Sequence, residues 1–265
     1  MPQIKPISSP ANPVVKQLKS LAVKKYRDEA GVFLVEGLRH VEDMLAAGWT
    51  PAALALTAPE IAENEGLIHT ATALQAEIYD MPAALLSRIT GRDNTQPVIG
   101  VFKQDWHGLQ TVSDSGAALW LLLEDIRDPG NLGTVIRTAD AVGAAGIILA
   151  GQTCDAFSPE AVRASMGSIA RVKLIRATIN DVDGWRRGWP GRIVGTHLRA
   201  DTDYRAADYA LPLILAMGSE QSGMSDALTD MCHNLVKIPM PGGTESLNLA
   251  VSTGIMLYEI SRGRI

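Results

Sequence analysis

Cysteines are scarce in this sequence, and long apolar runs are absent. The chain of 265 residues has two cysteines, Cys154 and Cys232, which lie far apart and outside any CxxC spacing. Their number and spacing suggest neither a disulfide framework nor a zinc site. The first twelve residues hold no apolar run, and Leu119–Leu123 is far shorter than the roughly 18 residues that span a bilayer. We therefore expect a soluble cytoplasmic protein without a signal peptide, membrane contact or bound metal.

Several familiar ligand-binding and catalytic motifs are also missing. No GxGxxG follows an apolar run and no GxxxxGK(S/T) occurs, which excludes a dinucleotide fingerprint and a P-loop. A GxSxG elbow is absent, which argues against an α/β-hydrolase. The five histidines form no HExxH motif and no close pair, so they indicate no metal site. These absences disfavour a nucleotide-dependent oxidoreductase.

Charge is unevenly distributed along the chain. The net charge of −5 argues against a protein that coats nucleic acid indiscriminately. Residues 1–40, however, carry seven basic and three acidic side chains, a net of +4, and the remainder carries −9. The basic region is either a surface that steers an anionic polymer or a solvated helix face, and charge alone favours the second. The candidate RNA-binding residues in it are Lys16, Lys19, Lys24, Lys25, Arg27 and Arg39.

The length suggests two domains. We place the first at residues 1–108 and the second at 112–265, with a linker in Trp106–Gly116, which is rich in Gly, Ser, Asp and Gln. Asn12-Pro13 predicts the start of an amphipathic helix with lysines on its outer face. The other elements expected in the first domain are strands at Val32–Val35, Leu54–Leu56 and Val98–Phe102 and helices at Leu38–Leu45 and Ala83–Ile89.

The second domain alternates apolar runs with helical stretches. The runs do not themselves alternate between apolar and polar residues, which is typical of strands buried on both faces. Strands separated by helices predict a parallel sheet covered on both sides, so we expect an α/β fold. The predicted strands are Leu119–Leu123, Ile147–Leu149, Ile193–Gly195, Leu213–Met217 and Val236–Ile238.

Loops that leave the carboxyl ends of parallel strands bind ligands, and three of these loops have unusual sequences. The first, Glu124–Gly133, leads into a helix that carries Arg137. Its Pro-Gly-Asn sequence is explained equally well as a turn with a helix cap or as a functional segment. Arg137 favours the functional interpretation of this segment, since a guanidinium in the first two helical turns can hold a phosphate with paired donors.

The second and third segments are Leu215–Ser225 and Ile238–Ser252. In the second, glycines permit close backbone approach to a flat ligand, and Glu220 is either an acid at a helix N-terminus or a carboxylate of a binding site. In the third, Ser246 is expected to cap the following helix, which leaves Asn248 in its first turn. The Asn248 amide can donate and accept together, as recognition of a ribose or a base edge requires.

Taken together and in this order, the segments resemble the three motifs of the SpoU (TrmH) family of RNA ribose methyltransferases, of the SPOUT class. The first motif corresponds to Asp125–Asp140, the second to Met217–Glu220, and the third to Ile238–Met240 with Ser246–Asn248. Ser158–Gly167 is similar to a further helix of the family. Phe33–Gly37 and Val98–Val101 resemble the small ribosomal-protein-like α/β substrate-binding domain that precedes many such enzymes.

The resemblance implies a C-terminal domain tied in a deep trefoil knot that holds S-adenosylmethionine, and a homodimer in which Arg137 approaches the partner's cofactor. It implies RNA as the substrate, with ribosomal RNA favoured over transfer RNA. The implied catalytic residues are Asn131, Arg137, Glu220, Ser246 and Asn248. The implied cofactor-binding residues are Thr196, His197, Leu198, Met217, Gly218, Glu220, Ile238, Met240, Ser246, Leu247 and Asn248.

In the implied reaction a ribose 2′-hydroxyl attacks a sulfonium methyl group, which requires alignment and the handling of one proton. Arginine stays protonated, so physical chemistry favours Arg137 as a phosphate clamp and alkoxide stabiliser, whereas proposals for the family make the corresponding arginine the base. Gln221-Ser222 and Pro241 depart from the family pattern beside the expected cofactor pocket. The alternatives are a transfer RNA methyltransferase and a non-catalytic RNA-binding or ribosome-assembly factor.

Overall fold

A computed structural model describes residues 3–112 and 118–264 of the chain. The chain divides into two compact units. The N-terminal unit comprises Met1–Asp105 and Phe157–Ala170, and the C-terminal unit comprises Trp106–Ala156 and Arg171–Ile265. Residues 113–116 of the predicted linker lie outside the described residues. In its described part, the His107 backbone pairs with Ile175 as a parallel bridge, so the segment joins the edge of the C-terminal sheet.

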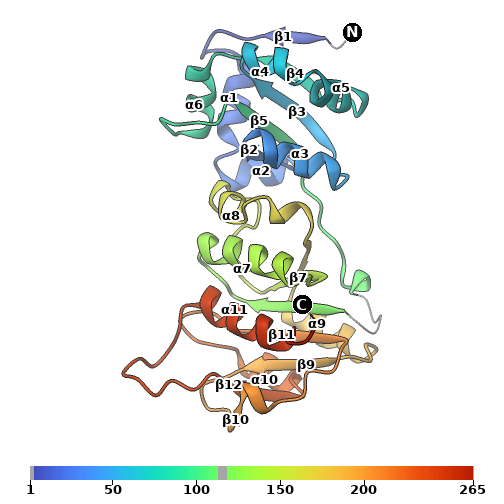
Figure 1. Cartoon of the computed structure of the whole chain (residues 1–265), viewed down its shortest axis with the longest axis vertical. Helices are drawn as coiled ribbons and strands as arrows, with labels where there is room; N and C mark the ends of the chain where they lie inside the picture. The colour runs from blue at the N-terminus through green and yellow to red at the C-terminus, as the bar shows by residue number, and fades with distance from the viewer. Residues whose placement is uncertain (1–2, 113–117, 265) are drawn as a thin grey trace. The chain divides into compact units, whose positions relative to one another are not determined.

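The described residues of the N-terminal unit form a five-stranded mixed sheet in the order β1-β4-β3-β5-β2 (Figure 1). Strand β5 runs antiparallel to both of its neighbours, and the remaining pairs are parallel. The strands are β1 (Ile4–Pro6), β2 (Val32–Glu36), β3 (Pro51–Leu56), β4 (Glu77–Asp80) and β5 (Val98–Lys103). The helices are α1 (Pro13–Ser20), α2 (Lys24–Ala30), α3 (Leu38–Ala46), α4 (Ala58–Glu63), α5 (Glu65–Ala73), α6 (Ala83–Thr90) and α8 (Pro159–Ala164).

Helix α1 forms as the sequence predicts. The Asn12 side chain accepts a hydrogen bond of 2.9 Å from the backbone N–H of Val14, which caps the helix. Leu18 is buried on its inner face, whereas Lys16 and Lys19 are exposed on the outer face. The capping residue and the apolar stripe therefore fix this helix and leave its lysines in solvent.

Arg27 corrects one expectation of the sequence. The sequence predicts Arg27 to face RNA with the other basic residues, but its side chain lies inside the N-terminal unit and Arg27 is 3% exposed. Its Nη1 donates a hydrogen bond of 2.6 Å to the carbonyl oxygen of Leu21. A buried guanidinium needs such partners, so Arg27 stabilises the turn between α1 and α2.

One segment of the C-terminal half of the sequence packs in the N-terminal unit. The Phe157 ring lies 4.5 Å from that of Phe33, and Trp49 Nε1 donates a hydrogen bond of 2.9 Å to Ala170 O. These contacts bury aromatic surface at both ends of the segment. The observed division therefore differs from the predicted 112–265 domain, which included residues 157–170.

The described residues of the C-terminal unit form a seven-stranded sheet in the order β10-β12-β9-β11-β6-β7-β8, with parallel neighbours throughout. The strands are β6 (Leu119–Glu124), β7 (Gly146–Ala150), β8 (Lys173–Ala177), β9 (Arg192–Thr196), β10 (Thr202–Asp203), β11 (Leu213–Met217) and β12 (Asn234–Lys237). The helices are α7 (Pro129–Ala141), α9 (Ile179–Arg186), α10 (Asp226–Met231) and α11 (Leu249–Ile260).

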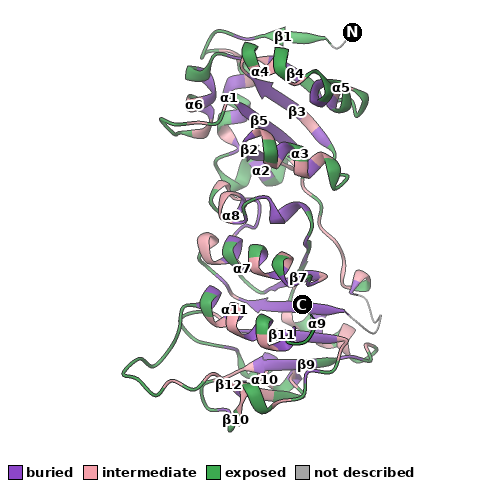
Figure 2. Cartoon of the chain, in the orientation of Figure 1, coloured by how far each residue is buried: buried purple, intermediate pink, exposed green. Residues whose placement is uncertain are grey.

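Both faces of this sheet are covered. Ile214 and Ala216 of β11 share a core cluster with Val182 of α9 and Leu228 of α10. Successive side chains of a strand point to opposite faces, so α11, which contacts β11 and α7, covers the other face. The central strands are buried along their length (Figure 2). The predicted parallel α/β sheet is confirmed. Across residues 3–112 and 118–264, no helix has the length and apolar character needed to cross a membrane.

Candidate active site

Strand order brings the three unusual loops to one edge of the C-terminal sheet. Strands β12, β9, β11 and β6 are neighbours, and their carboxyl ends point the same way because all of them are parallel. The segments that follow β6, β11 and β12 therefore start side by side.

Three side chains from these loops form a hydrogen-bonded chain, which we call the Asn–Glu–Asn triad (Asn131, Glu220 and Asn248). Asn131 Nδ2 donates to Glu220 Oε1 at 2.8 Å, and Asn248 Nδ2 donates to Asn131 Oδ1 at 3.0 Å. A carboxylate only accepts, so the Asn131 amide nitrogen must face Glu220 and its oxygen must face Asn248. The structure thus joins the residues that the sequence singled out in each loop.

Helix ends hold two members of the triad. Asp128 caps α7 by accepting a hydrogen bond of 2.6 Å from the backbone N–H of Asn131. Asn248 caps α11 through its Oδ1, which accepts from Ala250 N at 2.9 Å and from Val251 N at 3.3 Å. The expectation that Ser246 caps this helix is wrong. Because the oxygen of Asn248 serves the helix, its nitrogen is left to face Asn131.

Glu220 lies in a tight turn and not at a helix N-terminus. The backbones of Ser219 and Gly223 exchange hydrogen bonds of 3.1 and 3.0 Å across the turn, and the next helix begins at Asp226. A Cβ added to Gly218 would lie 2.0 Å from the carbonyl carbon of Gly223. The chain's own turn therefore requires glycine at position 218, whereas the sequence suggested ligand approach as the reason.

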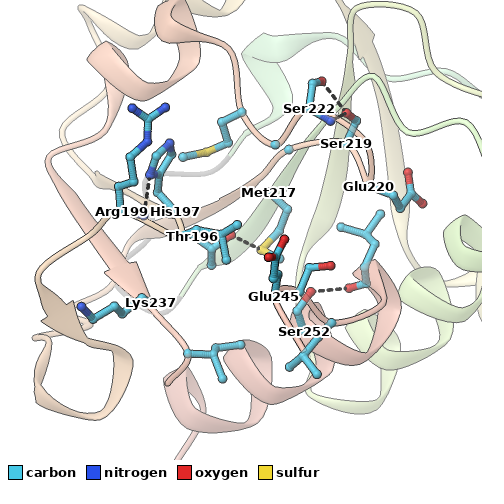
Figure 3. A pocket seen from close by; sticks show the side chains of 18 of the residues that line it. Thr196, His197, Arg199, Met217, Ser219, Glu220, Ser222, Lys237, Glu245 and Ser252 are labelled. Carbon is cyan, nitrogen blue, oxygen red and sulfur yellow. Dashed lines mark hydrogen bonds between the residues drawn. The ribbon is translucent and has the colours of Figure 1, made fainter. Parts of the chain in front are cut away.

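A cavity of about 380 Å³, a size typical of small-molecule sites, includes Glu220 of the triad in its lining. Figure 3 shows Glu220 among the side chains that line this cavity. The cavity is built from the ends of β9, β11 and β12 and the loops that follow them. Asn248 was also predicted to bind the cofactor but does not line the cavity; its side chain is linked through Asn131 to Glu220, which does. The other ten residues with that predicted role line the cavity: Thr196, His197, Leu198, Met217, Gly218, Glu220, Ile238, Met240, Ser246 and Leu247.

The walls of the cavity are held by local hydrogen bonds. The Thr196 hydroxyl donates to Met217 Sδ at 3.2 Å, and the Ser252 hydroxyl donates to Leu249 O at 3.0 Å (Figure 3). His197 Nδ1 accepts from the backbone N–H of Arg199 at 3.1 Å. The wall is thus preorganised, with both apolar and polar side chains directed at the cavity.

Some lining residues were missed by the sequence analysis. They include Arg199, Lys237, Glu245 and Ser252, which add charged and hydroxyl groups to the cavity. Lys237 ends β12 and Arg199 follows β9 by three residues, so strand ends were the signal that could have found them.

Glu124 is a further residue that the sequence analysis did not assign. It ends β6, is 5% exposed, and accepts hydrogen bonds of 2.7 Å from both the backbone N–H and the hydroxyl of Ser225. A buried carboxylate needs such donors. Glu124 therefore anchors the start of α10, and with it the end of the loop that carries Glu220. The position of this glutamate directly after an apolar run was the sequence signal that could have identified it as a buried residue of the site.

Arg137 lies outside the cavity. It is exposed on α7 and is not among the residues that line the cavity. Arg137 follows Asn131 by six positions, which corresponds to about 600° of helical rotation, so the two side chains leave α7 in different directions. Within residues 3–112 and 118–264, no hydrogen bond or ion pair involves its guanidinium. The fold therefore presents Arg137 to solvent.

The cysteines are not poised for chemistry. Burial raises the pKa of the Cys154 thiol to about 12, and the carboxylates of Asp128, Asp155 and Glu220 add to the rise. Such a thiol stays protonated at neutral pH and is a poor nucleophile. Among the described residues, no group of three or more His, Cys, Asp or Glu side chains is arranged to hold a metal ion.

Comparison with known proteins places this geometry in a family. Residues 118–258 match the SpoU rRNA Methylase family, and residues 12–100 match the MRM3-like substrate binding domain. The 23S rRNA (uridine(2479)-2'-O)-methyltransferase of Streptomyces viridochromogenes is 32% identical over 92% of this chain and 88% of its own. The 23S rRNA (guanosine(2553)-2'-O)-methyltransferase RlmP of Bacillus subtilis is 29% identical over 97% of this chain and 99% of its own.

Solved structures agree. The AdoMet-bound rRNA methyltransferase from Sinorhizobium meliloti is 41% identical and superposes with a TM-score of 0.94 over 99% of both chains. The SpoU methyltransferase AviRb from Streptomyces viridochromogenes, solved in complex with AdoMet, is 30% identical with a TM-score of 0.84 over 96% of this chain and 98% of its own. The sequence matches, the parallel sheet and the triad at its edge together show that the chain belongs to the SpoU rRNA methylase family.

Proposed function

We propose that this protein is a cytoplasmic enzyme that transfers the methyl group of S-adenosylmethionine to a ribose 2′-hydroxyl of ribosomal RNA. The observation that carries the proposal is the Asn–Glu–Asn triad, hydrogen-bonded across three loops beside a ligand-sized cavity. The names of the relatives support both the reaction and the RNA, since two that match almost end to end are 23S rRNA 2'-O-methyltransferases.

The lining of the cavity fits the proposed cofactor. Met217, Ile238 and Leu247 supply apolar contacts for an adenine ring, and the polar groups of the lining can meet a ribose and an amino acid. Glu220, at the same cavity, supplies negative charge that suits a sulfonium cation. When bound there, S-adenosylmethionine supplies an electrophilic methyl group. The residues of the triad would hold the ribose hydroxyl at that group.

The triad orients the acceptor and Arg137 stabilises its charge. Both the nitrogen and the oxygen of the Asn131 side-chain amide are hydrogen-bonded, so Asn131 fixes the Glu220 carboxylate at one position. Arg137 is a permanent cation, which favours a role in holding an RNA phosphate and the developing alkoxide. Because Arg137 does not line the cavity of its own subunit, we propose that it serves the cavity of a partner.

A homodimer would bring Arg137 of one subunit to the cavity of the other. Helices α7 and α11 pack against each other, and α11 exposes Val251 and Tyr258, each 53% exposed. Apolar side chains at the surface of a helix suit an interface between copies. Family membership also supports a trefoil knot in the C-terminal unit, which we include in the proposal.

The N-terminal unit is proposed to bind the RNA. Its match to a substrate-binding domain supports this, and so do the exposed Lys16 and Lys19 on α1. Lys24 and Lys25 of α2 lie near carboxylates of their own helix, at 2.6 Å from Asp28 and 3.8 Å from Glu29, so they contribute less free positive charge.

The test is methyl transfer by the purified chain. The protein is incubated with S-adenosylmethionine labelled on its methyl group and with unmodified 23S rRNA, and ribose methylation is mapped by nucleotide. We expect one methylated ribose and saturable binding of S-adenosylmethionine in calorimetry. A chain that binds rRNA but neither binds the cofactor nor methylates would be a non-catalytic RNA-binding factor. Methylation of transfer RNA alone would contradict the choice of RNA.

A further inference from the structure

A second cavity, of about 410 Å³, lies wholly within the N-terminal unit. It is formed by the β2–α3 turn, the segment before β5 and residues 162–169. Its floor includes the buried side chains of Val35, Met44 and Ile169. This cavity is distinct from the site at the edge of the C-terminal sheet, and its size and apolar floor are those of a small-molecule or nucleobase site.

Glu36 is an unusual acid in the wall of this cavity. It ends β2, and its side chain is only 9% exposed. Its Oε1 accepts a hydrogen bond of 3.2 Å from Arg163 Nη1, but its Oε2 is buried and accepts none from the described residues. Arg92 Nη1 lies 3.9 Å from Oε2, beyond hydrogen-bond distance. A buried acceptor without a donor is costly, so this oxygen is suited to a donor from a ligand.

The ion pair with Arg163 occupies only one oxygen of Glu36. Arginine–carboxylate pairs are frequently bidentate, with one N–H donated to each oxygen. Arg163 donates to one oxygen of Glu36 and leaves the other open. The carboxylate is therefore held in place by Arg163 while half of its accepting capacity stays unused.

The rim of the cavity is positive and partly apolar. Arg39, Arg92 and Arg163 line it around the single carboxylate of Glu36, and the Arg92 and Arg163 side chains are 51% and 38% exposed. Met166 also lines the cavity and is 55% exposed. Guanidinium groups grip phosphates and stack on flat rings, and a methionine side chain packs against aromatic faces.

We propose that this cavity takes one unstacked guanine base of the substrate RNA, with Glu36 as the residue that selects guanine. The proposal rests on the proposed function for its RNA substrate. Guanine presents two adjacent donors, N1–H and the N2 amino group, to a carboxylate, and its O6 can accept from a neighbouring guanidinium. Adenine and cytosine place an acceptor nitrogen beside their amino groups, and uracil flanks its single N–H with two carbonyls. Recognition of splayed bases by stacking and edge contacts is the usual route to RNA specificity.

The experiment measures binding of labelled pentaribonucleotides UUGUU, UUIUU and UUAUU to the full chain by fluorescence anisotropy at fixed salt. Inosine lacks the N2 amino group and so removes one donor. We expect UUGUU to bind at least about tenfold more tightly than UUAUU, with UUIUU severalfold weaker than UUGUU, as loss of hydrogen bonds to a charged group predicts. Glu36→Gln should reduce the preference for guanine to less than about threefold. The control variant Glu42→Gln makes the same change of carboxylate to carboxamide at an exposed residue of α3 outside the cavity. It should keep the preference for guanine.

Equal affinity for the three pentamers, no measurable binding of any of them, or a guanine preference that survives Glu36→Gln overturns the proposal. Thermal unfolding checks that Glu36→Gln folds. If this variant does not fold, the comparison of UUGUU with UUIUU on the unmodified chain tests the guanine pocket instead. Methyl transfer to rRNA is assayed in parallel. Normal methylation with indiscriminate pentamer binding rejects the guanine pocket alone, whereas a guanine preference without any methylation rejects the proposed enzyme alone.

Discussion

The substitution Asn248→Asp separates the two tasks of Asn248. Its Oδ1 caps α11 through Ala250 N and Val251 N, and its Nδ2 donates to Asn131 at 3.0 Å. Asp and Asn cap helices equally well, and a negative charge at a helix N-terminus is favourable. We therefore expect Asn248→Asp to keep the cap of α11 and to be more stable than Asn248→Ala, which loses the cap, by about 1 kcal/mol.

The same substitution should damage the triad. An aspartate cannot donate, so Asn131 meets an acceptor on each side and can satisfy only one of them with its nitrogen. Either its oxygen faces Glu220 or its oxygen faces the new carboxylate. Loss of a hydrogen bond to a charged group costs about 1.5 to 3 kcal/mol, which corresponds to a fall in kcat of roughly 10-fold to 100-fold.

The assay pairs methyl transfer to rRNA with urea unfolding. Asn248→Ala removes both the cap and the donor, so it should lose activity and about 1 kcal/mol of stability. Asn12→Asp makes the same change at the cap of α1 and should alter neither. Wild-type turnover by Asn248→Asp would refute the role of the triad. A loss of stability in Asn248→Asp equal to that of Asn248→Ala would refute the capping argument.

Three further perturbations test other parts of the structure. Gly218→Ala should weaken S-adenosylmethionine binding in calorimetry by more than about tenfold, because the added Cβ meets the backbone of Gly223 at 2.0 Å; unchanged binding would show that the turn does not shape the cavity. Ser225→Ala should lower the free energy of unfolding by about 1.5 to 3 kcal/mol, since it strips a donor from the buried Glu124, and a stability equal to that of the unmodified chain would contradict this. The pKa of Cys154 is raised from 9.0 to about 12, so the unfolded chain loses its thiol proton first and the stability due to this group is present below pH 9 and declines as pH rises from about 9 to 12. Alkylation of Cys154 by iodoacetamide at pH 8 should accordingly be slow, and a rate equal to that of a free cysteine would reject the shift.

The elements that the sequence predicted well are those whose signal is local. Leu213–Met217 is a strand with the predicted bounds, and Leu119–Leu123 is extended by one residue. Both are continuous apolar runs at the centre of the sheet, where burial on two faces leaves no polar position. β8 was missed because it is an edge strand, and its Lys173 and Arg176 are exposed and break the apolar run.

The site was predictable in its parts and not in its contacts. Strand ends and polar loops identified Asn131, Glu220 and Asn248, but their hydrogen bonds join residues 89 and 117 positions apart, and only the strand order brings these together. The sequence predicts Ser246 as the cap of α11, but Ser and Asn are equally good capping residues, and Asn248 caps the helix. Which of them caps the helix depends on where Leu249 enters the core, and the sequence alone does not show this.

The structure divides the candidate site into a fixed side and an open side. Asn131 and Asn248 lie at the N-terminal ends of α7 and α11, which pack against each other, so the packing of two helices positions these two members of the triad. The opposite wall includes Met240 and Leu247, at either end of a loop whose residues 241–248 are exposed throughout. Groups that align a reacting hydroxyl need support from rigid elements, whereas a wall that admits a ligand needs access from solvent. The departure at Pro241 lies in this exposed loop, whereas Gln221-Ser222 lie in the turn that carries Glu220, next to the triad.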